Sequence, residues 1–146
     1  KISDVEHMRG RKRNDAPILI AEDSPLLSKM IGTCLMQAGY DNITITDNGQ
    51  ECWNKLQEYL ASGELDQKVS CVITDIEMPQ MDGHRLTKLV KDSDKLKHIP
   101  VVIFSSLVNE EMRRKGEKLG ADIQLSKPEI GQLVGALDDL IGIDAE

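Results

Sequence analysis

The chain has 146 residues, enough for one domain with a proper hydrophobic core and too few for two ordinary domains. Hydrophobic residues make up 40% of it and charged residues 29%, which is typical of a globular protein and excludes a largely disordered one. No apolar run approaches the roughly 18 residues of a membrane-spanning helix, so no direct membrane insertion is expected.

The formal net charge of −7 is unevenly distributed along the chain. Residues 1–15 carry five bases and three acids, hence +2, which leaves −9 for the remainder. An acidic body argues against a nucleic-acid-binding face on the domain itself. The basic run 9–13 is short and has no aromatic partners, so we interpret it as a solvated linker.

We divide the chain into a leader of residues 1–15, a domain of residues 16–142 and a tail of residues 143–146. The first residue is Lys1 and no signal-peptide pattern follows, so we expect a piece cut from a longer protein. Three widely spaced cysteines without a Cys-x-x-Cys motif are expected to be small core residues of a cytoplasmic protein in a reducing location: Cys34, Cys52 and Cys71.

From Pro17 onward, strand patterns and helix patterns alternate along the chain. Short apolar runs predict strands at 18–21, 43–46, 71–74, 101–105 and 123–125. Apolar residues at helical spacing predict five helices. The residues expected to face the core lie within 27–38, 52–60, 86–90, 112–119 and 130–141.

Local signals refine this prediction. Ser24 is a good N-cap for the first helix, and Pro25 suits its first position. Residues 61–70 are expected to be a polar surface insertion. The fourth helix has a thin apolar stripe, essentially Met112 and Leu119, so we expect it to be loosely anchored.

Strict alternation of strands and helices predicts an α/β domain with a parallel sheet covered on both faces. The continuously apolar strands belong in the middle, and the strand 43–46, with its alternating threonines, belongs at an edge. In such sheets the functional site lies beyond the carboxyl ends of the strands, where the strand order reverses.

Polar side chains follow four of the expected strands. Glu22 and Asp23 follow the first, Asp75 the third, Ser105 ends the fourth, and Lys127 comes soon after the fifth. Because the carboxyl ends of parallel strands share one edge of the sheet, these side chains are expected to lie together there.

Three neighbouring carboxylates repel one another unless their pKa values rise or a hard divalent cation binds. Mg²⁺ (or Mn²⁺) suits the set, with Asp23 and Asp75 as direct ligands, Glu22 acting through water, and the backbone carbonyl of Glu77 as a further ligand. Asp75 is then the candidate nucleophile toward phosphorus. Lys127 is expected to neutralise phosphoryl charge, and Ser105 to donate a hydrogen bond to a phosphoryl oxygen.

The three histidines form no metal-binding spacing, and surface positions are expected for His7, His84 and His98.

Residues 17–141 resemble the receiver domain of two-component response regulators. The residues that carry the resemblance are Glu22-Asp23, Asp75 with Met78-Pro79 and Asp82-Gly83, Ser105, and Lys127-Pro128. The resemblance implies a flavodoxin-like fold with strand order 2-1-3-4-5 and phosphotransfer to Asp75 from a histidine kinase. It implies a signalling domain that catalyses its own phosphorylation and dephosphorylation rather than an enzyme. It also implies a cis peptide bond before Pro128.

The sequence departs from the receiver pattern at Gln124. Many receivers carry an aromatic residue at this position, three residues before the lysine, and that residue swings inward when the hydroxyl engages the phosphoryl group. Whether Gln124 replaces this aromatic switch or abolishes it stays open at the level of sequence.

More narrowly, the chain is similar to the receiver half of CheV-type chemotaxis coupling proteins. The segments that carry this likeness are 104–107, 113–116, 120–122, Gln124 and 126–130. It implies a CheW-like adaptor domain upstream of the leader, phosphorylation by the kinase CheA, and a role in coupling the chemoreceptor array to that kinase.

Other output classes remain possible from the sequence alone. A receiver of a transcription factor, or a single-domain regulator that binds the flagellar motor, carries the same site. An aspartyl-nucleophile phosphatase of the haloacid-dehalogenase group is a different class. Those enzymes place a second Asp two residues after the nucleophile, where this chain has Glu77.

Overall fold

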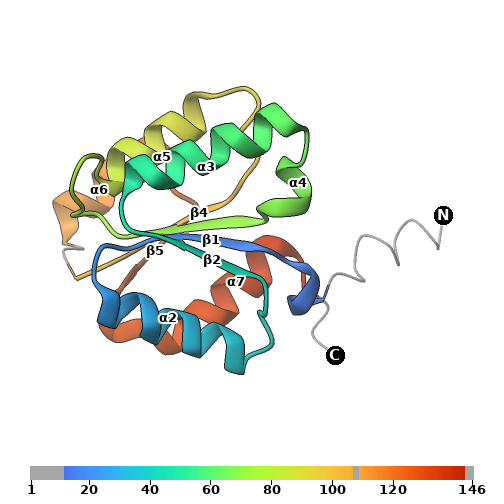
Figure 1. Ribbon diagram of the computed structural model, residues 1–146. Helices are drawn as coiled ribbons and strands as arrows, with labels where there is room; N and C mark the ends of the chain where they lie inside the picture. The colour runs from blue at the N-terminus through green and yellow to red at the C-terminus, as the bar shows by residue number, and fades with distance from the viewer. Residues whose placement is uncertain (1–11, 107–108, 144–146) are drawn as a thin grey trace.

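The computed structural model describes residues 12–106 and 109–143 (Figure 1). The strands are β1 (Ile18–Ala21), β2 (Ile43–Thr46), β3 (Cys71–Thr74), β4 (Val101–Ser105) and β5 (Ile123–Ser126). The α-helices are α2 (Pro25–Gln37), α3 (Gly49–Ser62), α4 (Leu65–Lys68), α5 (Gly83–Asp92), α6 (Glu110–Leu119) and α7 (Leu133–Ile141). Two 3₁₀ segments complete the fold, η1 (Arg13–Asp15) and η2 (Lys127–Gln132).

The five strands form one parallel sheet in the order β2-β1-β3-β4-β5, which confirms the expected topology with β2 at an edge. The chain moves outward from β1 to β2 and then crosses back to β3, so the order reverses between β1 and β3. Figure 1 shows α3, α4 and α5 on one face of the sheet and α2 and α7 on the other.

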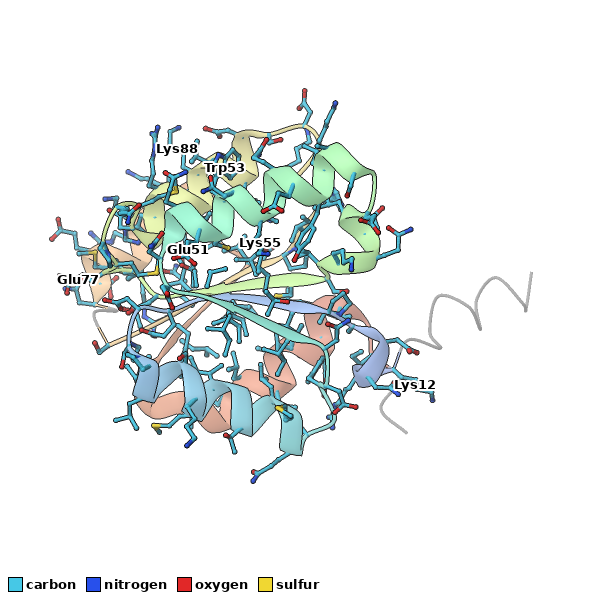
Figure 2. All side chains as sticks on the ribbon, viewed as in Figure 1. Lys12, Glu51, Trp53, Lys55, Glu77 and Lys88 are labelled. Carbon is cyan, nitrogen blue, oxygen red and sulfur yellow. The ribbon has the colours of Figure 1, made fainter. Side chains whose placement is uncertain are left out.

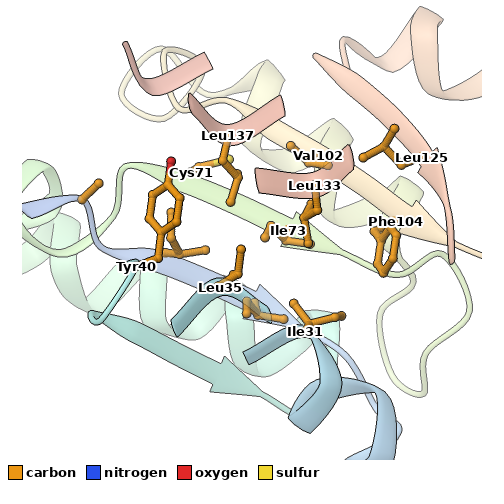
Figure 3. Packing of buried hydrophobic residues seen from close by; sticks show 13 residues of the cluster. Ile31, Leu35, Tyr40, Cys71, Ile73, Val102, Phe104, Leu125, Leu133 and Leu137 are labelled. Carbon is orange, nitrogen blue, oxygen red and sulfur yellow. The ribbon is translucent and has the colours of Figure 1, made fainter. Parts of the chain in front are cut away.

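Two hydrophobic clusters hold these layers together, one on each face of the sheet. Along β1, Ile18 and Ile20 point into the cluster beneath α2 and α7, while Leu19 and Ala21 point into the cluster beneath α3 and α5. Figure 3 shows the first cluster, in which residues of β3 and β4 meet residues of α2 and α7. Both faces of the central strands are therefore buried, which is why these strands are apolar throughout.

The predicted start of α2 is confirmed, since the Ser24 side chain accepts a hydrogen bond from the Leu27 N–H and Pro25 is the first helical residue. The weak anchoring of α6 is also confirmed. Within this helix Gly116 alone is buried, while Met112 and Leu119 are only half-buried.

Three expectations need correction. The segment 61–70 is more than a polar insertion, because Leu65 and Val69 are buried and secure the short helix α4 between them. The last helix begins at Leu133, after the 3₁₀ segment η2. Cys52 and Cys71 are buried as expected, but Cys34 is half-exposed because α2 turns that side chain toward the rim of the core.

Parts of the prediction lie at the margins of the described residues. Residues 1–11 of the leader and 144–146 of the tail fall outside them. No cis peptide bond occurs among the residues whose backbone and side chain are both described. Pro128 is not one of these residues, so the cis bond expected before it stays a prediction. Within the described ranges no helix is long and apolar enough to cross a membrane.

Candidate functional site

The acidic residues of the site come together because β1 and β3 are neighbours. Ala21 pairs with Thr74 at the ends of these strands, and the Asp75 N–H donates a 3.1 Å hydrogen bond to the Ala21 carbonyl. The next residues along each strand are Glu22 and Asp75. The strand crossing therefore brings carboxylates that are 53 positions apart in the sequence to one edge of the sheet.

Glu22, Asp23 and Asp75 each offer a carboxylate oxygen, and these three oxygens lie within 4.8 Å of one another. Glu22 and Asp75 are buried, with 2% and 7% exposure, while Asp23 is exposed. Carboxylate oxygens in this arrangement are the hard donors that Mg²⁺ and Mn²⁺ prefer. The donor set therefore fits a divalent cation that enters from the solvent side, past Asp23.

Lys127 lies between two of these carboxylates. Its Nζ is 3.1 Å from Oε1 of Glu22 and 3.1 Å from Oδ2 of Asp75, and the ammonium is largely buried. Burial lowers the pKa of Lys127, but the charges and hydrogen bonds of Asp75 and Glu22 outweigh it, so the pKa lies above its ordinary value. Lys127 is therefore a fixed positive charge on the acidic cluster.

The two oxygens of Asp75 have different surroundings. Oδ1 accepts a 2.7 Å hydrogen bond from the Ile76 N–H, while Oδ2 faces the Lys127 ammonium. The side chain is thus held in one orientation by its own backbone. One oxygen of a buried carboxylate is presented to a positive charge, which is the geometry of a positioned oxygen nucleophile.

Glu22 is the most deeply buried acid of the cluster. Burial raises its pKa, and the hydrogen bond from the Ser24 N–H, 3.1 Å from Oε2, works in the opposite direction. Asp75 raises the pKa further and Lys127 lowers it, and the net result is a carboxyl that ionises above its ordinary range. Ionised Glu22 is thus costly in the metal-free protein, and a bound cation offsets that cost.

The other predicted site residues lie at the same edge. Ser105 is fully buried at the end of β4 and pairs in register with Ser126, so the chain passes directly from there to Lys127. Glu77 is exposed two residues after Asp75, and Figure 2 shows it at the end of the sheet near α6. Every predicted site residue is therefore placed at the carboxyl edge of the sheet.

Two features of the site went beyond the sequence prediction. Thr74 Oγ1 donates a 2.8 Å hydrogen bond to the Asp75 carbonyl, and Gly83 packs directly against that same carbonyl. The close approach at Gly83 explains the glycine in the Asp82-Gly83 pair, since a side chain at that position would displace the loop that carries Asp75.

The expected surface position of His84 is wrong. Its side chain is buried with 3% exposure, and Nε2 has no hydrogen-bond partner among the described residues. Burial lowers the pKa of His84, and the nearby charge of Lys115 lowers it further. The helix α5 turns His84 toward α6. The local sequence, one histidine after a glycine, does not indicate this burial.

Comparison with known protein families identifies the family, because the family model of the response regulator receiver domain matches residues 18–138. The chain belongs to this family. Receiver domains are signalling domains that receive phosphate from histidine kinases, and they bind Mg²⁺ or Mn²⁺ at an acidic pocket. This chain has an acidic cluster, Glu22, Asp23 and Asp75, at the edge of the sheet described above.

Two curated relatives come from chemotaxis. Over 121 residues the chain is 36% identical to the chemotaxis protein CheY of Treponema pallidum, covering 82% of this chain and 78% of that protein. Over 109 residues it is 36% identical to the chemotaxis protein CheV2 of Helicobacter pylori, covering 72% of this chain and 32% of that protein. The chain thus spans about a third of the length of CheV2.

A solved structure supports the same fold. The chemotaxis protein CheY4 of Vibrio cholerae superposes with a TM-score of 0.72 at 25% identity, covering 86% of this chain and 98% of the other. The expected flavodoxin-like arrangement of five parallel strands with helices on both faces is therefore confirmed.

Proposed function

We propose that this receiver is phosphorylated on Asp75 by the phosphohistidine of a histidine kinase. The observation that supports this most directly is the position of the Lys127 ammonium, 3.1 Å from both Asp75 and Glu22. A surface aspartate needs no such arrangement. A buried aspartate with one oxygen held by its own backbone and the other facing a fixed cation suits phosphoryl transfer.

In the proposed step, Oδ2 of Asp75 attacks phosphorus. A P–O bond forms, the P–N bond to the kinase imidazole breaks, and the imidazole nitrogen leaves with the bonding electron pair. Lys127 neutralises charge on a phosphoryl oxygen, and Ser105 donates a hydrogen bond to another. The cation, held by Asp23, Asp75, Glu22 and the Glu77 carbonyl, supplies further neutralisation of phosphoryl charge when bound.

Phosphorylation then biases partner binding through the α6 side of the domain. Within this helix only Gly116 is fully buried and Met112 and Leu119 are half-buried, so little packing energy opposes its displacement. A change at Ser105, at the end of β4, reaches α6 through the connection that follows. The output is a shift between two arrangements of this face, which partners distinguish.

We further propose that the kinase is CheA-like and that the output adjusts chemoreceptor coupling in a cytoplasmic array. The likeness to CheY and CheV2 supports a chemotaxis role, and the CheV2 match covers 32% of that protein, which is compatible with the proposed CheW-like adaptor domain upstream of residue 16. Free thiols at Cys34, Cys52 and Cys71 are compatible with a reducing compartment. A receiver of another output class is the alternative.

Mass spectrometry after treatment with acetyl phosphate tests the phosphorylation itself. A Mg²⁺-dependent addition of one phosphate is expected in the native chain and in Asp94→Asn, an exposed control on the far edge. The addition should be absent in Asp75→Asn. Equal phosphate incorporation in Asp75→Asn and the native chain would overturn the assignment of the acceptor.

Phosphotransfer from purified kinases tests the chemotaxis assignment separately. Phosphorylated CheA is expected to transfer its label to the chain at least tenfold faster than phosphorylated kinases from non-chemotactic pathways. If a non-chemotactic kinase transfers faster than CheA while acetyl phosphate still labels Asp75, the receiver chemistry stands and the chemotaxis role fails.

A further inference from the structure

Arg13, in the segment just before the first strand, reaches across the fold to α7. Its Nε donates to Oδ1 of Asp138 at 3.1 Å, and its Nη2 donates to Oδ2 at 2.6 Å. Both carboxylate oxygens are thus held by one guanidinium, in the two-pronged geometry that gives arginine–carboxylate pairs their directionality. The two residues are 125 positions apart in the sequence.

The carboxylate of Asp138 is also tied to the core. The hydroxyl of Tyr40 donates to Oδ1 at 2.7 Å, and Tyr40 is fully buried. Figure 3 shows Tyr40 within the core cluster, with its hydroxyl directed toward the helix that carries Leu137. Asp138 is therefore oriented by the core and presents a prearranged acceptor to the chain that enters the domain.

The same guanidinium also contacts the end of α2. Its Nη1 donates to the Ala38 carbonyl at 2.7 Å, where the last turn of the helix leaves carbonyls without helical partners. Gly39 follows with a φ of +107°, which glycine adopts readily, and a Cβ there would stand in ordinary van der Waals contact with Arg13, 3.7 Å from its Cβ and Cδ. The guanidinium also lies 6.0 Å from the centre of the Tyr40 ring. Arg13 thus joins η1, α2 and α7.

The electrostatics agree with a charged and well-bonded pair. Burial alone would raise the pKa of Asp138, but the hydrogen bonds from Arg13 and Tyr40 outweigh it and lower the pKa below its ordinary value. The hydrogen bond with Asp138 raises the pKa of Arg13 against the opposing effect of burial. The side chains are 37% and 24% exposed, so solvent weakens the pair without removing its geometry.

We propose that Arg13 is a clasp that docks the entering chain on α2 and α7, so that residues 12–16 belong to the domain. Any domain that precedes residue 12 would then be attached beside α7, at the edge of the sheet opposite Asp75. This proposal does not depend on the phosphorylation chemistry, because none of the clasp residues belongs to the site. It replaces the expected linker with a docked segment at residues 12–15.

Limited trypsin digestion of the full chain under native conditions tests the clasp. Trypsin must bind the side chain that precedes the cut, so a clasped Arg13 should resist cleavage before Asn14, whereas the exposed Lys12 should not. Mass spectrometry distinguishes the products that begin at Arg13 and at Asn14. We expect Asp138→Asn to accelerate the cut after Arg13 at least tenfold.

Asp139→Asn is the matched control, because it removes the same charge from the neighbouring, exposed position of α7. Its cleavage pattern should equal that of the native chain. Arg13→Lys keeps the charge and the trypsin site but loses the two-pronged contact, and it should be cut as readily as Asp138→Asn. Equal cleavage after Arg13 in Asp138→Asn and Asp139→Asn would overturn the proposal.

Amide hydrogen exchange separates the clasp from a general loss of stability. In Arg13→Ala, exchange should accelerate at least fivefold near the end of α2 and in α7, while α5 and the strands β3 and β4 keep their native rates. Uniform acceleration across these elements would show that Arg13 supports overall folding without docking the segment, and would contradict the proposal.

Discussion

Gly83 packs against the backbone of Asp75, the residue proposed to accept the phosphoryl group. A Cβ at residue 83 would collide with the Asp75 carbonyl oxygen and would stand 2.8 Å from the carbonyl carbon and 3.1 Å from Cα of Ile76. The neighbours are backbone atoms, which cannot rotate away as a side chain does. The first turn of α5 and the loop after β3 thus approach each other as closely as glycine permits.

Gly83→Ala is therefore expected to destabilise the domain by about 1–3 kcal/mol, the usual cost of overpacking. It should also slow phosphorylation, because the displaced backbone carries Asp75. Urea denaturation measures the first effect, and acetyl phosphate labelling the second. Gly135→Ala is the control, since nothing lies within 4 Å of a Cβ at that position of α7. It should gain roughly 0.5–1 kcal/mol from helix propensity.

Gly116 and Gln124 are expected to be energetically coupled. Nε2 of Gln124 donates a 2.9 Å hydrogen bond to the Arg113 carbonyl, and Nη1 of Arg113 donates to the Gln124 carbonyl at 3.3 Å. A Cβ at residue 116 would lie 2.6 Å from Cδ of Gln124. The amide that stands where many receivers have an aromatic residue thus joins β5 to the loosely anchored α6, over a glycine that makes room for it.

A double-mutant cycle measures this coupling. Gly116→Ala should destabilise the native chain, whereas in a Gln124→Ala background it should stabilise, because the helix-propensity gain is then unopposed. We expect a coupling energy of about 1 kcal/mol, within the range for contacting residues, from urea denaturation of the four proteins. Additive effects would show that the amide moves aside freely and does not latch α6.

Glu22→Gln is expected to stabilise the metal-free protein at neutral pH. The pKa of Glu22 is raised by folding, so the folded state holds this proton more tightly than the unfolded state. The destabilising effect of Glu22 therefore develops as the pH rises from the ordinary pKa of glutamate to the raised pKa of Glu22 in the folded state. It is complete above the raised pKa. Since glutamine does not ionise, the advantage of the variant should shrink as the pH falls through this window.

Thermal denaturation in EDTA between pH 4 and pH 8 checks this sign. Glu58→Gln, at an exposed position of α3, serves as control and should follow the native profile. An advantage of Glu22→Gln that grows as the pH falls would contradict the argument. With Mg²⁺ present the native chain should be more stable than Glu22→Gln, because only the native chain has the Glu22 carboxylate through which the cation stabilises the folded state.

Lys127→Met is expected to slow phosphorylation of Asp75 by about 10²-fold, the usual effect of removing one group that stabilises developing charge. Mg²⁺ affinity should not fall, because the variant loses a competing positive charge 3.1 Å from two of the carboxylates. Acetyl phosphate kinetics and calorimetric Mg²⁺ titration separate the two effects. Lys118→Met, exposed on α6, is the control and should leave both unchanged. Weaker Mg²⁺ binding in Lys127→Met would show that the lysine organises the metal ligands.

The agreement between sequence and structure is best where the signal is local. Strand bounds followed from apolar runs, and the Ser24 cap followed from residue type and position. The short helix α4 was missed because only Leu65 and Val69 carry its signal, which is too little apolar periodicity to recognise within a polar stretch. His84 was misplaced because burial of one residue depends on which helix packs beside it.

The amino-acid sequence by itself determined the strands and the acids, hydroxyl and lysine that follow them, because hydrophobic period and residue type act over a few neighbouring positions. It thereby predicted that these side chains lie at one edge of the sheet. Tertiary structure alone decided the pairing of Arg13 with Asp138, the packing of the Gln124 side chain against Gly116 and the burial of His84. These contacts join segments on different elements. Their partners are set by how the helices pack on the two faces of the sheet, and no local pattern records that packing.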